Sequence, residues 1–342
     1  MKSVLQKITH QMELNQDDIN TAIFGIKEGS FSSVQVAGFL MGLLMKGLTT
    51  SEIAGIARSM RQACVSLSTG EEDLIDTCGT GGGLTTFNVS TANALLSCAG
   101  GVKIAKHGSR SISASSGSAD VLEALGIPVE LEPHQAEQLI EEIGFSFLYA
   151  PLYHPVMMKV FGPESDLGIK TIFFTVIGPI INPANARRHV LGVYQPHLLE
   201  QVAEVVRELD LRHVMVVHGV DGLDEISLMG ETRIAEVLNG QIKYYTIAPE
   251  DFGLKRCTLK DIQGGSPEYN ARVIRNIFAG IDTGPKRDMV LLNAAATFIV
   301  AGKAASFAQG LAIGTELIDS GIALAKLDQI IARTREIRGR IN

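Results

Sequence analysis

The sequence contains no tryptophan, and aromatic residues make up only 6% of the chain. Cysteine is also scarce, with four residues in the chain, and they are scattered without CxxC spacing. They are Cys64, Cys78, Cys98 and Cys257. Scattered thiols argue against a disulfide framework or a cysteine-rich metal site, because both require a regular set of paired cysteines. We therefore expect ordinary reduced thiols.

Long apolar runs and an excess of positive charge are absent as well. No apolar stretch approaches the roughly 18 residues needed to span a bilayer. The first residues, MKSVLQKITHQMELNQDD, lack the apolar centre of a signal peptide. The net charge is -7 and the pI is about 5.7, so non-specific binding to nucleic acids or membrane surfaces is not expected. These absences predict a soluble cytoplasmic protein without a nucleic-acid or membrane partner.

The composition favours a substantial folded core. The chain has 342 residues, of which 46% are hydrophobic and 20% charged, and this length suggests two domains or one large domain with a small appendage. Residues 1–70 are expected to form a small all-helical domain, because no strand pattern precedes residue 73. The predicted helices span 3–14, 17–27, 33–46 and 49 to about 64. Thr49 and Glu52 form a capping box at the start of the last one.

From residue 73 onward, short apolar runs alternate with glycine-rich turns and helical stretches. Strands are predicted at 74–75, 102–105, 127–130, 145–149, 214–218, 232–237 and 242–247. Helices are predicted at 90–99, 119–125, 290–301, 305–320 and 322–333. Such alternation implies crossover connections and a mostly parallel sheet. The expected fold class is α/β, with a small helical N-terminal domain and a larger α/β domain over 71–342.

The segment from Asp76 to Asn88 reads DTCGTGGGLTTFN and lies between a predicted strand and a predicted helix. Its glycines let backbone amides surround an anion, and the following helix directs its positive end to the same place. The hydroxyls of Ser90 and Thr91, in the first turn of that helix, can add phosphate contacts. The segment matches neither the nucleoside-triphosphatase nor the dinucleotide pattern. Taken alone, such a turn is as often structural as functional.

Two further segments carry related chemistry. Residues 106–120 read KHGSRSISASSGSAD, where Lys106 can neutralise phosphate and six serines supply hydroxyls. We place this segment in a loop after the strand that ends at residue 105; a solvated polar loop is the alternative. Asp224 and Glu225 end a third segment and can hold hydrated Mg²⁺ together with substrate phosphate, although adjacent surface acids are usually only solvated. Together the three segments predict a polyphosphate site with magnesium.

These motifs, in this order, resemble the anthranilate phosphoribosyltransferase family over essentially the whole chain. The matching segments are GTGG at 79–82, TFNVST at 86–91, KHGSR at 106–110, SGSADVLEALG at 116–126, APLYHP at 150–155, GPIINP at 178–183 and HGVDGLDE at 218–225. The resemblance implies a nucleoside phosphorylase-like phosphoribosyltransferase fold, in which roughly residues 160–185 join the helical domain in space. It also implies a homodimer formed through the helical part.

The implied reaction is a step of tryptophan biosynthesis. Anthranilate attacks C1 of 5-phosphoribosyl-1-diphosphate, and pyrophosphate leaves. Because metal ions and fixed amide donors stabilise the leaving group, no covalent nucleophile is required. By resemblance, the ligands of the diphosphate and ribose phosphate are Gly79, Gly81, Asn88, Ser90, Thr91, Lys106 and Ser118. The implied Mg²⁺ set is Ser90, Asp224 and Glu225. His107 and His154 are expected to line the acceptor pocket, with satisfied structural histidines as the alternative. The remaining expected substrate-binding residues are Thr80, Gly82, Thr86, Gly108, Ser109 and Arg110.

Departures from the family pattern concern metal use and the acceptor. Gly83 stands where the family often has an aspartate, and Ser109 where it has an asparagine. Glu164 lies in the stretch where an arginine commonly binds the acceptor carboxylate; the replacement cations considered are Lys159, Lys170 and Arg110. Phe174 also replaces a frequent asparagine. These changes leave two alternatives open: an enzyme with another aromatic or heterocyclic acceptor (a phosphoribosyltransferase or a nucleoside phosphorylase relative), and a non-catalytic nucleic-acid-binding paralogue.

Overall fold

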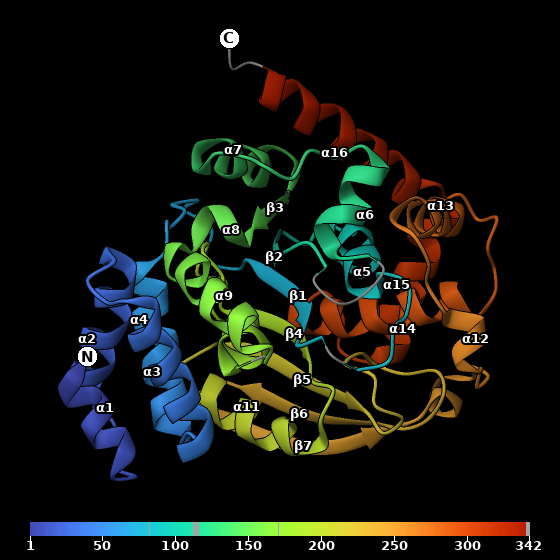
Figure 1. The fold of residues 1–342 in the computed structure, drawn as a ribbon. Helices are drawn as coiled ribbons and strands as arrows, with labels where there is room; N and C mark the ends of the chain where they lie inside the picture. The colour runs from blue at the N-terminus through green and yellow to red at the C-terminus, as the bar shows by residue number, and fades with distance from the viewer. Residues whose placement is uncertain (82, 112–115, 170, 340–342) are drawn as a thin grey trace.

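The computed structural model describes residues 1–81, 83–111, 116–169 and 171–339. Its centre is a seven-stranded sheet with the order β3-β2-β1-β4-β5-β6-β7 (Figure 1). The strands are β1 (Ile75–Gly79), β2 (Ile104–Gly108), β3 (Phe145–Tyr149), β4 (Arg188–Gly192), β5 (His213–Gly219), β6 (Thr232–Leu238) and β7 (Gln241–Ile247). The first five are parallel, whereas β6 and β7 pair antiparallel at one edge. The predicted α/β class with a mostly parallel sheet is therefore confirmed.

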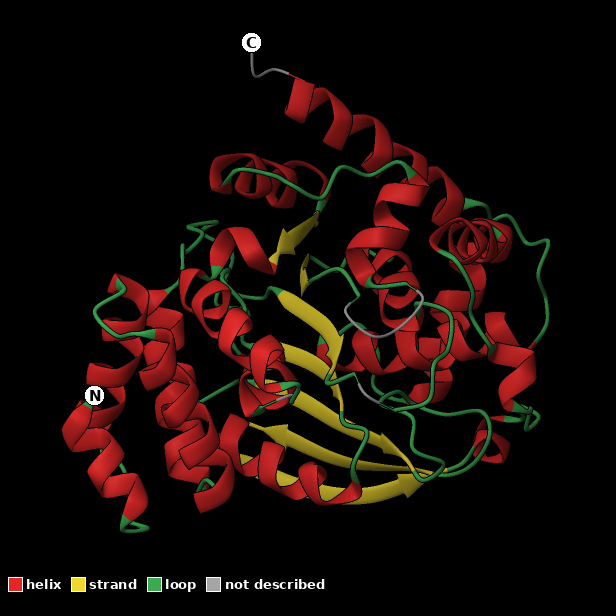
Figure 2. Cartoon of the chain, viewed as in Figure 1, coloured by secondary structure: helices red, strands yellow, loops and turns green. Residues whose placement is uncertain are grey.

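Helices precede the sheet, cover both of its faces and end the chain (Figure 2). They are α1 (Lys2–Thr9), α2 (Gln16–Glu28), α3 (Ser33–Lys46), α4 (Thr50–Ala63), α5 (Val89–Ala99), α6 (Ser118–Leu125), α7 (Pro133–Ile143), α8 (Ala150–Tyr153), α9 (Pro155–Leu167), α10 (Gly178–Ile180), α11 (Pro196–Glu208), α12 (Leu259–Ile262), α13 (Pro267–Phe278), α14 (Pro285–Val300), α15 (Phe307–Asp319) and α16 (Ile322–Gly339). The π-helix η1 (Phe173–Ile177) and the 3-10 helix η2 (Pro249–Phe252) complete the set.

Glu52 connects the helices of the N-terminal region. Thr49 and Glu52 form the predicted capping box, which satisfies free amide groups at the start of α4. The Glu52 carboxylate is fully buried, where it pairs with Lys46 at 2.7 Å and also accepts the Leu14 amide at 2.9 Å. One side chain thus ties together three segments of the helical region. Helix α9 packs against α2 and α3, so a later part of the chain joins this region.

Two hydrophobic cores lie on opposite faces of the sheet. One contains α5, α6, α13, α14 and α16 together with side chains from β1, β2, β3 and β5. The other contains α1–α4, α9, η1 and α11 together with alternate side chains of β4, β5 and β6. Since successive side chains of a strand point to opposite faces, Met215 and Val217 enter the first core while Val214 and Val216 enter the second. The sheet is covered on both faces, as parallel sheets generally are.

The β6–β7 connection is a two-residue turn at Asn239 and Gly240. Both residues have positive φ, 49° and 79°, which suits a tight hairpin between antiparallel strands. Leu238, the last residue of β6, pairs with His213, the first residue of β5. The turn therefore lies at the amino edge of the parallel strands.

Several predicted boundaries are wrong. No strand forms at 127–130, where the chain has no regular secondary structure. Strand β2 runs from Ile104 to Gly108 rather than 102–105, so Lys106 and His107 belong to a strand and not to a loop. Helix α1 ends at Thr9 instead of residue 14, and β4 was not predicted. The domain boundary near residue 70 stays a prediction.

The described residues include no helix that is both long and apolar enough to cross a membrane.

Candidate active site

Three loops meet at the carboxyl edge of the parallel strands. Their described residues are 80–81 and 83–88 after β1, 109–111 and 116–117 after β2, and 220–231 after β5. Because β1 lies between β2 and β4, and β5 is the next strand along, all three loops leave the sheet on the same side (Figure 1). Ligands of open α/β sheets generally bind in the crevice beyond this edge. The topology therefore brings together the three segments that the sequence singled out.

The glycine-rich loop lies directly against the acidic loop. The Gly81 amide donates to Asp224 Oδ2 at 2.8 Å. A Cβ atom at Gly79 would lie 2.3 Å from the same oxygen, and one at Gly83 would lie 2.4 Å from the Gly222 carbonyl oxygen. The family's frequent aspartate at position 83 thus has no space in this backbone arrangement. Gly82 lies outside the described residues.

The Asp224–Glu225 pair provides two adjacent half-buried carboxylates. Thr86 donates its hydroxyl to Glu225 Oε2 at 3.1 Å. Burial raises the pKa of both groups, and the charge of Asp224 raises that of Glu225 further. Two neighbouring carboxylates resist full ionisation unless a cation joins them. Hard carboxylate oxygens beside hydroxyl groups suit Mg²⁺, so these residues fit the metal predicted for them.

Lys106 lies beneath the glycine-rich loop, where its side chain is almost fully buried. Its ammonium group donates to the Thr77 carbonyl and lies 3.4 Å from Ser90 Oγ. Burial lowers the pKa of Lys106, and the nearby Asp76 opposes this shift. Thr91 Oγ1 is buried without a hydrogen-bond partner in the described structure. A cation and an unused hydroxyl at the start of α5 form a site suited to an anion.

Asn88 joins the glycine-rich loop to two other segments. Its amide donates to the Ser116 carbonyl at 3.2 Å, and its oxygen accepts from Ser116 Oγ at 3.0 Å and Asn270 Nδ2 at 2.9 Å. Asn270 was not predicted as part of the site. Ser118 begins α6, with its Cβ 3.4 Å from a Cβ built at Gly108. The predicted ligands Asn88 and Ser118 therefore lie where the loops that follow β1 and β2 approach each other.

His107 and His154, which the sequence predicted to line the acceptor pocket, form a buried pair. Their ring centroids are 4.9 Å apart in an edge-to-face arrangement. The backbone of Gly178 hydrogen-bonds one ring nitrogen of His107, while His107 Nε2 and both nitrogens of His154 lack partners in the described structure. Burial lowers the pKa of His154 to about 4 and lowers that of His107 strongly, so both rings are neutral at pH 7. Three of the four ring nitrogens of this pair therefore lack a partner in the described structure, unlike those of typical structural histidines.

Arg110 and Ser109 are placed differently from what the sequence suggested. The Arg110 guanidinium pairs with Glu123, approaches Asp120 at 3.4 Å and stacks over the Tyr149 ring at 5.5 Å. Ser109 is exposed. Arg110 is therefore engaged in holding the 106–111 segment to α6, and it is not a free cation directed at a ligand.

Glu164 is buried and acts within its own segment. Its carboxylate accepts the Thr171 amide at 2.6 Å, which fixes the chain between α9 and η1. Lys159 is exposed on α9, near Gly29 of the helical region. Lys170 lies outside the described residues. The acid at 164 therefore has a structural role that its position in the sequence did not indicate.

Asp76 and Asn182 form a further polar contact that the sequence analysis missed. The fully buried Asp76 carboxylate accepts the His107 amide at 3.1 Å and Asn182 Nδ2 at 2.8 Å. Asn182 also donates to the Ala105 carbonyl at 2.7 Å. Burial raises the pKa of Asp76 to about 6. An aspartate inside an apolar strand and the GPIINP turn were the available signals.

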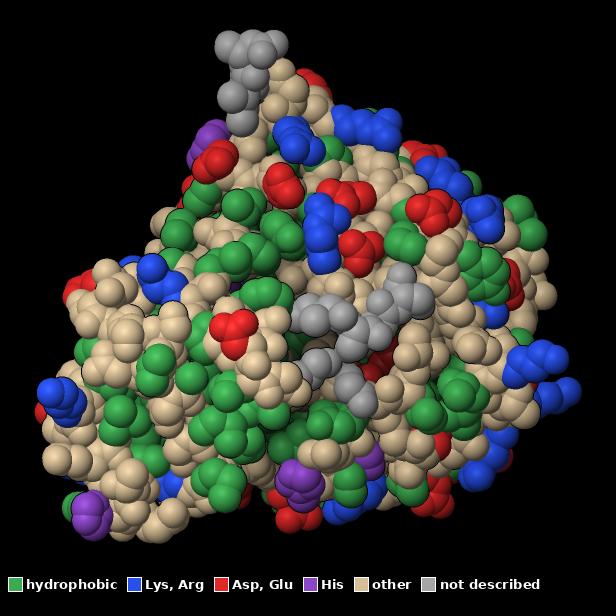
Figure 3. All heavy atoms as spheres, in the orientation of Figure 1, with side chains coloured by type: hydrophobic (Ala, Val, Ile, Leu, Met, Phe, Trp, Pro, Cys, Tyr) green, Lys and Arg blue, Asp and Glu red, His purple; other side chains and the backbone are tan. Residues whose placement is uncertain are grey.

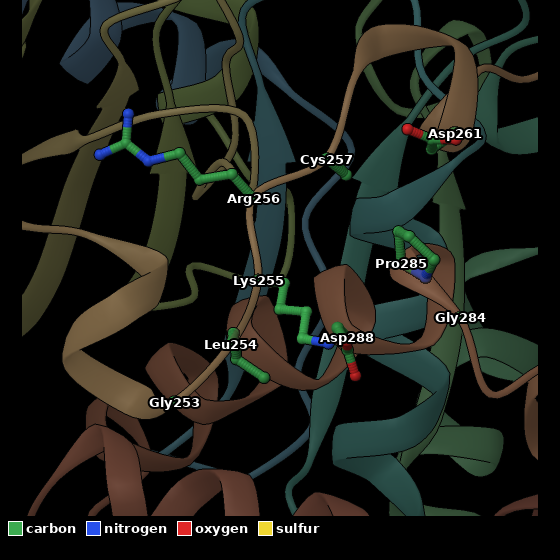
Figure 4. Close-up of a pocket in the computed structure, with 9 residues that line it drawn as sticks. All are labelled: Gly253, Leu254, Lys255, Arg256, Cys257, Asp261, Gly284, Pro285 and Asp288. Carbon is green, nitrogen blue, oxygen red and sulfur yellow. The ribbon is translucent and has the colours of Figure 1, made fainter.

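A cavity of about 420 Å³ lies elsewhere, between residues 253–257 and the start of α14 (Figure 4). The Lys255 side chain points toward Asp288 across it. Arg256, also in its lining, is paired with Glu250 at 2.7 Å. The lining includes none of the predicted site residues, so we assign the chemistry to the sheet edge.

Both parts of the chain match known families. Residues 2–64 match "Glycosyl transferase family, helical bundle domain", and residues 71–324 match "Glycosyl transferase family, a/b domain". The chain is 44% identical over 335 residues to anthranilate phosphoribosyltransferase from Acetivibrio thermocellus, which covers 98% of this chain and 96% of that protein.

Solved structures agree with this. Anthranilate phosphoribosyltransferase from Thermus thermophilus superposes with a TM-score of 0.91 at 40% identity, over 97% of this chain and 99% of that one. The Saccharomyces cerevisiae enzyme in complex with PRPP and Mg gives 0.89 at 27% identity, over 98% and 97%. Its complex with 4-fluoroanthranilate gives 0.88 at 26% identity, with the same coverage.

Proposed function

Since this chain belongs to the anthranilate phosphoribosyltransferase family, we propose that it transfers the phosphoribosyl group of 5-phosphoribosyl-1-diphosphate to anthranilate. The amine nitrogen forms a bond to C1, the bond from C1 to the diphosphate oxygen breaks, and pyrophosphate leaves. The amine gives up one proton. This reaction is a step of tryptophan biosynthesis. The observation that carries the proposal is the contact between the glycine-rich loop and the Asp224–Glu225 pair, made through the Gly81 amide.

The phosphoribosyl donor is expected to bind along the loops that follow β1 and β2. The Gly81 amide faces Asp224, whereas the Thr80 amide donates to the Gly192 carbonyl. Ser90 and Thr91 offer hydroxyls at the start of α5. Lys106 supplies a buried positive charge close to Ser90, where it neutralises phosphate as a point charge. Asn88 and Ser118 would hold the donor from the side of α6. Fixed donors of this kind stabilise charge on a leaving group without reorganising.

Magnesium is the expected metal, held by Asp224 and Glu225 with Ser90. The two carboxylates are adjacent, half buried and short of compensating positive charge. When bound, the metal supplies positive charge that stabilises the departing pyrophosphate. Thr86 orients Glu225 through its hydroxyl, so that the carboxylate is fixed before the donor binds.

The acceptor is expected to lie against His107 and His154. Neutral imidazoles with unused nitrogens can accept N–H groups from an aromatic amine and orient it toward C1. The relatives' shared name supports anthranilate over other aromatic or heterocyclic acceptors. The Glu164 side chain is buried and bonded to the Thr171 amide within its own segment, so we place it outside the acceptor pocket.

A homodimer formed through the helical region is part of the same proposal. Apolar side chains are exposed along α3, with Val34 81%, Leu44 50% and Met45 76% accessible. Figure 3 shows hydrophobic side chains gathered on the face over α3 and α9. Exposed apolar patches on this scale mark interaction surfaces. The cytoplasmic location stays a prediction.

The test is pyrophosphate release from 5-phosphoribosyl-1-diphosphate and Mg²⁺, with and without anthranilate, while anthranilate fluorescence is followed in parallel. Acceptor-dependent release with matching loss of fluorescence supports the proposal. Donor binding without turnover of anthranilate contradicts the acceptor assignment.

The metal assignment is tested by combining Asp224→Asn with Glu225→Gln. Loss of the carboxylate charges should lower kcat by at least about 100-fold, since charge stabilisation of this kind supplies several kcal/mol. Glu231→Gln is the matched control, because Glu231 is an exposed acid at the end of the same loop. Full turnover in the double variant at saturating Mg²⁺ contradicts the assignment.

A further inference from the structure

A second group of side chains with potential metal-ligand atoms lies within the sheet. Asp76 and Cys78 are alternate residues of β1, and His189 is the residue of β4 that pairs with Asp76. Alternate residues of a strand point to the same face, and the paired position faces the same way. One ligand atom from each of the three side chains lies within 4.8 Å of the other two. The group combines a carboxylate, a thiol and an imidazole, whereas the Asp224–Glu225 pair offers oxygen alone.

His189 is arranged as a metal-binding histidine usually is. The side chain is fully buried, and its Nε2 lies 2.9 Å from the Ala186 carbonyl oxygen. Because a carbonyl can only accept, Nε2 carries the proton and the lone pair is on Nδ1. Nδ1 is buried and has no partner in the described structure. Burial lowers the pKa of His189 to about 4, which keeps the ring neutral. Metal-ligating histidines typically donate their second nitrogen to a backbone carbonyl in this way.

The other two side chains are also suitable. Asp76 is held by the His107 amide and the Asn182 amide, one on each carboxylate oxygen, and each oxygen keeps a further acceptor position. Cys78 is partly exposed as a residue, whereas Asp76 and His189 are buried. Its thiol makes only a weak contact, 3.6 Å to the Pro179 carbonyl oxygen.

We propose that Asp76, Cys78 and His189 bind a zinc-type divalent cation, separately from the magnesium site. Thiolate and imidazole ligands select zinc, copper or cobalt over magnesium. Binding replaces the Cys78 thiol proton, which goes to solvent, and the two anionic ligands then balance the 2+ charge. Tetrahedral zinc holds such ligand atoms about 3.3–3.6 Å apart, so the group must contract by roughly 1 Å. The fourth position is left to water.

Cobalt(II) is the probe, added to the substrate-free protein in saturating Mg²⁺ so that the oxygen site is occupied. We expect one equivalent of Co²⁺ to produce a thiolate-to-cobalt charge-transfer band in the near ultraviolet, which one equivalent of Zn²⁺ removes. Cys78→Ser should abolish the band. His189→Gln should weaken the titration at least about ten-fold, since even outer-shell changes cost 10–100-fold. Cys64→Ser is the matched control, a half-exposed thiol that also donates to a backbone carbonyl.

Absence of the band in the wild-type protein overturns the proposal, as does an undiminished band in Cys78→Ser or its loss in Cys64→Ser. Circular dichroism verifies that each variant is folded. If Cys78→Ser does not fold, X-ray absorption of the zinc-loaded wild-type protein decides. One sulfur neighbour near 2.3 Å supports the site, and a shell of oxygen and nitrogen alone overturns it. No substrate is present, so failure here is independent of the transferase activity.

Discussion

Replacement of His154 by leucine should reduce the loss of stability that the protein suffers on acidification. The imidazole is 1% exposed, and neither of its nitrogens has a partner in the described structure. Burial lowers the pKa of His154 from 6.5 to about 4, because a charged ring would lose its hydration. The unfolded chain therefore takes up a proton at a pH where the folded chain does not. Stability from this group is present above pH 6.5 and is lost as the pH falls toward 4.

The magnitude follows from the two pKa values. At pH 7 protonation of the unfolded chain costs the folded state only about 0.2 kcal/mol, and at pH 5 it costs about 2 kcal/mol. A leucine of similar volume does not titrate. Between pH 7 and pH 5, the free energy of unfolding of His154→Leu should therefore fall by roughly 2 kcal/mol less than that of the wild-type protein. At pH 7 itself the change should be small, since the ring has no hydrogen bond to lose.

Urea unfolding followed by far-UV circular dichroism measures the free energy of unfolding at each pH, which suits a protein without tryptophan. Protein concentration and ionic strength are held fixed, and no substrate is present. His197→Leu is the control, because an exposed imidazole meets water in the folded and unfolded chains alike. Parallel pH curves for wild-type protein and His154→Leu would refute the reasoning.

Three further predictions concern individual contacts. Lys106→Met should raise the KM for 5-phosphoribosyl-1-diphosphate at least about ten-fold, because a buried charge-assisted contact is lost; an unchanged KM in initial-rate assays removes Lys106 from the site. Gly83→Ala should lower stability by about 1–3 kcal/mol in urea unfolding, because its Cβ would lie 2.4 Å from the Gly222 carbonyl oxygen; wild-type stability contradicts that packing. Glu164→Gln should leave the KM for anthranilate within about two-fold, because the amide oxygen can still accept from Thr171. A large fall in this KM would mean that Glu164 repels the acceptor.

The parts of the site that depend on short-range signals could be predicted from the sequence. The glycine-rich loop before Ser90 and the acidic pair at Asp224 and Glu225 are contiguous motifs, and the alternating pattern indicated a mostly parallel sheet. Since loops that follow neighbouring parallel strands leave the same edge, the convergence of these segments follows from topology.

Contacts between distant residues were not predictable in the same way. Arg110 looked like an anion-binding cation, yet its partner Glu123 is on the next helix and its face meets Tyr149 on another strand. Strand β4 was not predicted because it is only five residues long and begins with two polar residues. These are Arg188, which pairs with Asp73, and His189, whose Nε2 lies near the Ala186 carbonyl oxygen. Lys106 was assigned to a loop because the predicted strand ended at residue 105. In β2 its buried charge is compensated by Thr77 and Asp76, an arrangement that is rare for lysine.

The hairpin turn at Asn239 and Gly240 makes the protein amenable to insertion. The turn lies at the amino edge of the parallel strands, opposite the loops of the candidate site, and its strands carry none of the proposed ligands. Exposed two-residue turns tolerate added sequence because few tertiary contacts depend on them. A peptide tag or a small reporter domain could therefore be inserted between these two residues for immobilisation or spectroscopy, away from the candidate active site.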